Sequence, residues 1–458
     1  MPFRRCDLIV GKNSLWNEIA VLKYFTDPVL RAPTVGSMLI CLAASLMGTF
    51  AFLKKRSLMG EALSHAAYPG VVVGVTLCAF LETVSFSGSL LFAIGGAFLF
   101  SLFGLWTIEW LEKSGKTPGD AALCFMLASF FAFGLLVFSY LQSAYPLFAS
   151  HVQIYLYGQS ATMTDFHTMI YGGLAAVIVL FLVVAYRPLQ AMHFDQNFSS
   201  SAGVSPPYLS SIAFVLLVLS IVIGIRGVGV ILMSGMFIAP AIAARQWSDR
   251  LSVILWLAAL FGLLSGFLGN ILSVDLSTHL SVFFPERRLS LPTGPMIILV
   301  GSSFAFFSLL FSPKRGVIAR IVRILQFRLR SDEENILKAI WKRGGISLSE
   351  CRKTIHLWLP TLFYLLWRMQ RHGWLVWAYQ RYSLTPDGTR KAARIVRLHR
   401  LWEVYLTDLG WPEDQVHRTA EEMEHILTPE LENRLSKQLN FPRFDPHEQP
   451  IPEKDDFR

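Results

Sequence analysis

Hydrophobic positions along the chain follow one pattern up to residue 312 and a different one after it. A helix that crosses a bilayer needs about 20 mostly apolar residues. Apolar runs of about this length predict nine transmembrane helices, at 34–53, 62–81, 90–109, 121–140, 168–186, 208–225, 228–245, 251–273 and 293–312. After residue 331, apolar residues recur at helical spacing and are interrupted by turn residues, which predicts a small helical domain.

Turn signals subdivide this C-terminal domain. Residues 346–375 have the length of a helix-turn-helix, with the second helix starting near Pro360. Residues 374–385 are rich in Trp, Val and Tyr, so they predict a short hairpin. These signals therefore predict a helix-turn-helix, then a short hairpin, then further helices over 386–458.

The composition agrees with a membrane protein. Of 458 residues, 53% are hydrophobic and 16% charged, whereas a soluble protein has about a quarter charged residues. Positive charges mark the cytosolic ends of membrane helices. They cluster at 54–56, 113–116, 187, 245–250 and 314–315. These positions alternate correctly with nine spans, so we expect the N-terminus outside and the C-terminal domain in the cytosol.

Two flanking segments have an amphipathic pattern. Residues 1–30 contain Arg4 and Arg5 but no continuous apolar stretch and no small-residue cleavage site, so we expect an amphipathic lead-in. Residues 313–331 place Arg320 and Arg323 among Val, Ile, Leu and Phe at helical spacing. Such a linker is typical of a basic amphipathic helix on a membrane surface. A solvated connector helix is the alternative.

One pair of ionisable residues lies inside a predicted span. Glu61 and His65 are four residues apart, so they share one helical face near the cytosolic end of the second span. Ionisable groups inside a membrane usually serve a transport pathway. The alternative is a glutamate that reaches the polar surface beside a hydrogen-bonded histidine.

The surrounding sequence resembles a known permease family. GTFAFLKKRSLMGEALSHAAYPG, GVGVILMSGMFIAPAIAA and LSLPTGPMIILVG are similar to motifs of the ABC metal-importer permeases for zinc, manganese and iron, over residues 25–312. The resemblance implies a permease domain at 31–312 in a bacterial inner membrane, with Glu61 and His65 lining the metal route. The family usually has Asp where this chain has Glu61.

A long polar loop follows the fifth span. It contains Phe194, Asp195, Gly203 and Val204 and resembles the family segment that packs against the ATP-hydrolysing subunit; an ordinary interhelical loop is the alternative. A phosphate-binding loop would need Gly where Trp110 stands, so we expect no enzyme in this chain. The resemblance implies an ABC ATPase, an extracytoplasmic metal-binding protein and a second permease subunit as partners.

Potential metal ligands gather near the C-terminus. His399 and Glu403 are four residues apart. A second group falls within an arc of roughly 100° if a single helix carries it, and it comprises His417, Glu421, Glu424 and His425. Carboxylates and imidazoles on one face indicate a metal site. A solvated acidic helix with incidental histidines is the alternative.

Both groups resemble the metal sites of diphtheria-toxin-repressor-like regulators, over about residues 332–452. The resemblance implies a metal-binding and dimerisation domain at 386–458 that forms a homodimer. By position, its primary site comprises Glu421, Glu424 and His425 with Asn335 from the first helix, and its ancillary site comprises His399, Glu403 and His417. Oxygen and imidazole ligands without thiolate suit Mn(II) or Fe(II) better than Cu(I). We expect Mn or Fe rather than Zn at this regulatory site.

The same resemblance makes 332–385 a winged helix-turn-helix that binds a DNA operator. It places Pro360, Thr361 and Tyr364 at base-facing positions, and Arg368 and Arg371 nearer to phosphates. The remaining residues of this second helix are strongly apolar, so degenerate DNA binding is an alternative.

The complete layout resembles chlamydial permease–repressor fusions. The predicted fold class is an all-α polytopic membrane protein of about nine transmembrane helices, followed by a small winged-helix domain and a helical metal-binding domain. The predicted function is a permease subunit of an ABC importer for Mn, Fe or Zn, fused to a metal-dependent transcriptional repressor. Proteolysis within 313–331 would release the repressor. The alternative is a permease whose C-terminal domain senses metal and inhibits transport without binding DNA.

Overall fold

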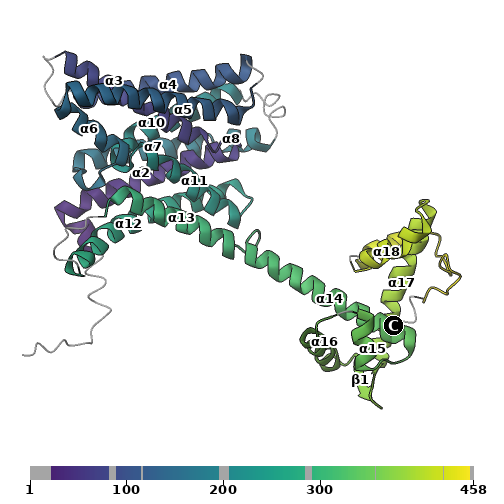
Figure 1. The fold of residues 1–458 in the computed structure, drawn as a ribbon. Helices are drawn as coiled ribbons and strands as arrows, with labels where there is room; N and C mark the ends of the chain where they lie inside the picture. Colours follow the sequence, from purple (N-terminus) through teal and green to yellow (C-terminus); the bar gives the residue numbers. More distant parts are fainter. Residues whose placement is uncertain are drawn as a thin grey trace, which may run out of the picture. The chain divides into compact units, whose positions relative to one another are not determined.

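The computed structural model describes residues 22–81, 89–114, 117–194, 206–283, 291–355, 357–425 and 428–453. The chain forms two compact units, Met1–Ala319 and Arg320–Arg458 (Figure 1). We call them the membrane unit and the regulatory unit. Residues 1–21, which make up most of the predicted lead-in at 1–30, lie outside the described residues.

The membrane unit consists of helices. They are α2 (Pro28–Leu53), α3 (Met59–Phe80), α4 (Ser89–Ser114), α5 (Gly119–Ala144), α6 (Pro146–Tyr157), the 3-10 turn η2 (Ser160–Thr162), α7 (Asp165–Val184), α8 (Tyr186–Phe194), α10 (Pro206–Val228), α11 (Val230–Trp247), α12 (Leu251–Phe283) and α13 (Thr293–Phe311). Among the described residues, eight helices are long and apolar enough to cross a membrane: α2, α3, α4, α5, α7, α10, α12 and α13. The predicted span at 228–245 coincides with α11, which is not one of these eight helices, so the described residues contain eight candidate spans where nine were predicted. This confirms an all-α polytopic membrane protein, although the sequence did not predict the short helix α6.

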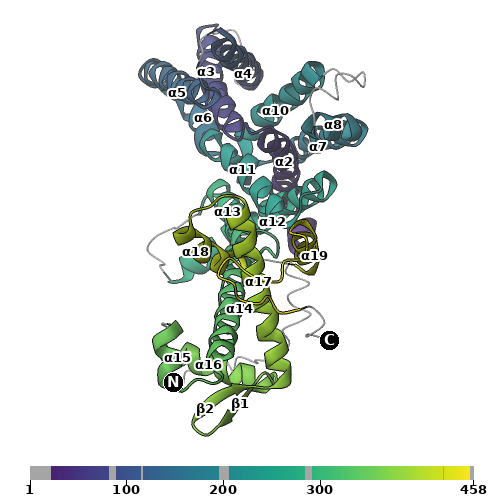
Figure 2. The same cartoon turned by 90° about the vertical axis from the view of Figure 1, so that its right-hand side faces the viewer.

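Small residues let the membrane helices approach closely. Helix α3 packs against α4 and α5, which lie beside it in both views (Figures 1 and 2). A Cβ added to Gly70 of α3 would lie 2.2 Å from the carbonyl oxygen of Gly96 in α4. A Cβ on Gly48 of α2 would lie 2.0 Å from the carbonyl oxygen of Phe237 in α11. Close backbone contact through glycine is a common way to pack helices in lipid, where no hydrophobic effect drives helices together.

The regulatory unit begins inside a helix. Its elements are α14 (Val317–Arg343), α15 (Leu348–Ile355), α16 (Leu359–Arg371), β1 (Leu375–Ala378), β2 (Arg381–Leu384), α17 (Pro386–Asp408), α18 (Glu413–Met423) and α19 (Pro429–Gln438). Most of the predicted linker (313–331) and the first residues of the predicted winged helix-turn-helix domain (332–385) fall in α14. From Val317 to Phe327 its large apolar residues are exposed, whereas Ile336, Leu337 and Ile340 are buried in the core of the unit.

The hairpin expected at 374–385 is present. Strands β1 and β2 pair antiparallel with Leu375 opposite Leu384 and Ala378 opposite Arg381. Tyr379 and Gln380 connect them with positive φ values of 52° and 61°, which is the backbone of a two-residue hairpin turn that matches the strand twist. The hairpin therefore forms a wing next to α15 and α16 (Figure 2).

Candidate metal centre and nucleic-acid interface

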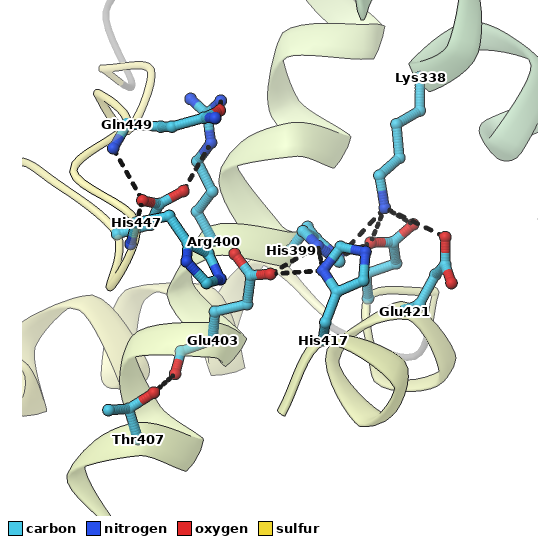
Figure 3. A network of polar contacts seen from close by, with 11 residues as sticks. Lys338, His399, Arg400, Glu403, Thr407, His417, Glu421, His447 and Gln449 are labelled. Carbon is cyan, nitrogen blue, oxygen red and sulfur yellow. Dashed lines mark hydrogen bonds and ion pairs between the residues drawn. The ribbon is translucent and has the colours of Figure 1, made fainter. Parts of the chain in front are cut away.

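Three predicted ligands meet in the regulatory unit. His399 and Glu403 project from one face of α17, and His417 reaches them from α18 (Figure 3). His417 Nδ1 is 2.7 Å from Glu403 Oε1 and 3.2 Å from His399 Nε2, and His399 Nε2 is 3.1 Å from the same Glu403 oxygen. We call these residues the His399 trio. Ligand atoms about 2.1 Å from one ion lie about 3.0–3.4 Å apart. The two distances from His399 Nε2 fall in this range, whereas the 2.7 Å between His417 and Glu403 is that of a hydrogen bond, so a divalent ion would have to take the place of that bond.

The trio is open on one side. The side chains of His399 and Glu403 are 5% and 3% exposed, whereas that of His417 is 54% exposed. Two ligands are thus fixed by packing, while the third borders solvent. A metal ion could therefore enter the site from the side of His417.

A buried carboxylate orients His399 from behind. His399 Nδ1 is 2.6 Å from Glu424 Oε2, and the Glu424 side chain is fully buried. When Nδ1 donates its proton to Glu424, the lone pair of Nε2 points at the trio. A carboxylate behind a histidine ligand is the usual arrangement at protein metal sites, because it fixes the ring and increases its basicity.

The charges of this region shift several pKa values. Burial alone would raise the pKa of Glu403, but hydrogen bonds from His399 and His417 outweigh it and lower that pKa to about 2. Burial alone would lower the pKa of His399, but hydrogen bonds to Glu403 and Glu424 raise it above its ordinary value. Glu403 is therefore ionised at neutral pH, and His399 holds its proton more tightly than usual.

Two of the other predicted ligands contact a lysine. We call Glu421, Glu424 and His425 the Glu424 cluster. Lys338, from α14, places Nζ 2.9 Å from Glu424 Oε2, 3.1 Å from His399 Nδ1 and 3.9 Å from Glu421 Oε1 (Figure 3). Its side chain is only 6% exposed. The ammonium group of Lys338 thus lies next to the carboxylate oxygens that would bind an ion in this cluster. With the lysine in that position, the cluster does not fit a metal ion.

His425 has a different partner. Its Nδ1 lies 2.7 Å from Glu334 Oε2 of α14, and Glu334 also pairs with Arg330. Burial alone would raise the pKa of Glu334, but its bonds with His425 and Arg330 lower it. Sequence reasoning chose Asn335 as the first-helix ligand. The structure brings the neighbouring Glu334 to His425, and no hydrogen bond joins Asn335 to either cluster among the described residues.

The sequence patterns did not predict that Glu334 and Lys338 contact the candidate ligands. Neither is part of a spaced ligand motif, and the amphipathic pattern of α14 gives Lys338 no special place. The helix that carries the second group of ligands also ends earlier than assumed. Helix α18 stops at Met423, and Glu424 forms its C-cap, so His417 and Glu421 are the members of that group that lie within the helix.

In the membrane unit, Glu61 and His65 lie on α3, and both side chains are partly buried. The ring of His65 contacts Phe131 of α5 edge-on, with centroids 4.7 Å apart. His65 Nδ1 is buried without a hydrogen-bond partner among the described residues. Most buried polar atoms have a hydrogen-bond partner, and one that lacks it costs stability.

Of the four residues predicted to couple to the ATPase, the structure describes Phe194. Phe194 is the last residue of α8. Asp195, Gly203 and Val204 lie outside the described residues.

Helix α16 separates its apolar residues into two groups. Leu362, Leu365 and Leu366 are buried, which explains most of the apolar character seen in the sequence. Phe363, Tyr364 and Trp367 are exposed.

The residues of α16 chosen as DNA contacts differ in accessibility. Pro360 is exposed and Thr361 is half-buried. Arg368 Nε binds Glu333 Oε1 at 2.9 Å, and the Arg371 guanidinium lies 5.4 Å from the centre of the Trp367 ring. Of the two arginines, Arg371 is therefore the freer to reach a phosphate.

Comparison with known proteins identifies the family. The model of the ABC 3 transport family matches residues 26–312, which is more than half of the chain. The chain belongs to the ABC 3 transport family. The model of the iron dependent repressor, metal binding and dimerisation domain matches residues 385–453, the region of α17 to α19. The suspected combination of an ABC 3 permease with a repressor-like C-terminal domain is thus confirmed.

Three known proteins are similar to this chain over most of their own length. A protein of Chlamydia trachomatis serovar D named "Probable metal transport system membrane protein" is 35% identical over 94% of this chain and 97% of the relative. The manganese transport system membrane protein MntC of Bacillus subtilis is 33% identical over 86% of each chain. PsaBC from Streptococcus pneumoniae, solved with a Fab, covers 67% of this ABC 3 chain and 99% of its own at 23% identity and a TM-score of 0.54, which shows the permease fold.

Proposed function

We propose that this chain is the permease subunit of an ABC importer for a divalent metal and that its C-terminal domain is a metal-dependent transcriptional repressor. One observation carries the proposal. A single chain joins an ABC 3 permease at 26–312 to a repressor-type metal-binding domain at 385–453, and the latter contains the His399 trio. The proposed domains are a lead-in at 1–30, the permease at 31–312, a linker at 313–331, the reading head at 332–385 and the metal-binding and dimerisation domain at 386–458.

In the permease, Glu61 and His65 are the proposed contacts of the transported ion. A carboxylate and an imidazole one turn apart on α3 can bind a divalent ion in succession or together. The buried, unpaired Nδ1 of His65 supports this role, because a passing metal would satisfy it. Manganese is the favoured cargo, given the name of the Bacillus subtilis relative.

Transport needs subunits that the chain does not supply. We propose that ATP hydrolysis occurs on a separate ABC ATPase, which docks on the cytosolic loop containing Phe194, Asp195, Gly203 and Val204. An extracytoplasmic binding protein delivers the metal, and a second permease subunit completes the pathway. The location is the bacterial inner membrane, with the regulatory unit in the cytosol.

In the regulatory unit, the His399 trio is the proposed holder of the sensed metal, Mn(II) or Fe(II). Two imidazoles and a carboxylate supply nitrogen and oxygen ligands, and a bound ion would provide the positive charge that links α17 to α18. Metal binding then favours a homodimer whose α16 helices bind an operator. Pro360, Thr361 and Tyr364 would face bases, while Arg368 and Arg371 would lie nearer to phosphates.

A second function is favoured by one observation. The exposed face of α16 carries Phe363, Tyr364 and Trp367, and Arg368 is already paired with Glu333. Such a surface has few free donors for base edges, so it could instead dock on protein and inhibit transport when metal is abundant. Release of the unit by cleavage within 313–331 would favour the repressor over this tethered inhibitor.

The full chain in lipid nanodiscs tests the repressor. Fluorescence anisotropy with DNA from its own promoter is measured with Mn(II) and with a chelator. We expect Mn(II)-dependent, sequence-selective binding that the His417→Ala variant loses. If the wild type binds no DNA selectively while Mn(II) slows ATP-driven uptake in proteoliposomes, the second function is correct.

A further inference from the structure

The strongest unexplained feature of the molecule is the buried ammonium group of Lys338. It comes from α14, yet it lies among ligands of α17 and of the turn after α18 (Figure 3). Nζ is within 3.1 Å of both oxygens of Glu424. A lysine is almost never buried without a partner, and here the partner is a residue expected to bind metal.

The position of the ammonium group excludes an ion beside it. Glu424 is fully buried, so its charge requires a counter-ion in the folded protein. Lys338 supplies that charge, and a divalent ion held by Glu421 and Glu424 would come close to it. Both groups are positive, so the two cations compete for the same carboxylate.

The His399 trio is not affected in the same way. Its ligand atoms are His399 Nε2, Glu403 Oε1 and His417 Nδ1, whereas Lys338 faces the opposite nitrogen of the His399 ring. The imidazole separates the ammonium group from the trio. Glu424, held by Lys338, remains in place to orient that ring.

We propose that Lys338 replaces one of two metal ions with a fixed charge, so that the regulatory unit binds a single divalent ion, at His399, Glu403 and His417. This inference rests on the proposed metal sensing by the same site. It has a structural consequence: Lys338 joins α14 to the ligand-bearing helices before any metal binds. Metal therefore adds one cross-link, between α17 and α18, to a unit whose reading head is already attached.

The test counts ions and their proximity in the full chain in nanodiscs, with Mn(II) as the probe. Lys338→Met removes the charge and keeps an unbranched side chain. Lys342→Met, one turn further along α14 and exposed, is the matched control. Bound Mn(II) is measured by equilibrium dialysis, and electron paramagnetic resonance distinguishes an isolated ion from a spin-coupled pair.

We expect the wild type and the Lys342→Met variant to show only uncoupled Mn(II). The Lys338→Met variant should bind one more ion per chain, give the spectrum of a coupled pair, and lose both changes when Glu421→Ala is added. A coupled pair in the wild type, or no additional ion in Lys338→Met, would overturn the proposal. Lys338→Gln replaces the methionine variant if circular dichroism shows that the latter is unfolded.

Failure of the underlying function has a different signature. If His417→Ala leaves the number of ions bound by the wild type unchanged, the trio is not a metal site, whatever Lys338→Met does. If His417→Ala removes one ion and Lys338→Met adds none, the trio stands and the role of Lys338 is wrong.

Discussion

Two residues of α18 allow a direct test of which carboxylates and imidazoles bind metal. His417 and Glu421 are one helical turn apart, and their side chains are 54% and 53% exposed. Replacing either by Ala removes a similar amount of surface and leaves a good helix former in place. Only His417 contributes to the His399 trio.

The structure sets the expected magnitudes. Loss of a residue that merely supports a metal ligand lowers affinity about 10–100-fold. His417 would contact the ion itself, so we expect His417→Ala to lower Mn(II) affinity by more than about 100-fold, or about 2.7 kcal/mol. Glu421 Oε1 lies 3.9 Å from Lys338 Nζ, and the carboxylate is half exposed. Such pairs contribute about 0.2–1 kcal/mol, so Glu421→Ala should change affinity by less than about fivefold.

The assay is competition between the full chain and a fluorescent Mn(II) chelator at pH 7, with circular dichroism to confirm that both variants are folded. Equal losses for the two variants would refute the assignment to the His399 trio. A larger loss for Glu421→Ala would make the Glu424 cluster the principal site.

Three further results are expected. His65→Ala should abolish ATP-driven Mn(II) uptake in proteoliposomes without preventing copurification of the ATPase; normal uptake would remove His65 from the pathway. The pKa of His399 is raised, so protons compete with metal for this residue above pH 6.5. Mn(II) affinity should therefore increase with pH in that range by up to about tenfold per pH unit, and calorimetry in two buffers should detect the released protons. An affinity that does not change with pH would contradict this. Gly70→Val should separate α3 from α4, because even a Cβ would lie 2.2 Å from the Gly96 oxygen. The substitution should therefore lower the thermal unfolding midpoint, and an unchanged midpoint would show that the contact is not needed.

The membrane architecture could be read from the sequence because the bilayer imposes a simple rule. Each span must be an apolar helix of about 20 residues, so hydropathy alone located the helices to within a few residues at most ends. The far end of α12 is an exception, because it continues to Phe283, ten residues beyond the predicted 273. The spacing of His399 and Glu403 was equally informative, since residues four apart share a helix face whatever the tertiary fold.

Only the tertiary structure decided which residues meet across helices. Lys338 lies 61 residues before His399 and 86 before Glu424, and nothing in its local pattern distinguishes it from an exposed lysine. The same holds for Glu334, which contacts His425, and for the leucines of α16, whose burial depends on α14. Local periodicity specifies the faces of a helix, but the partner of each face is set by packing between segments distant in sequence, and the charge of a metal site depends on that packing.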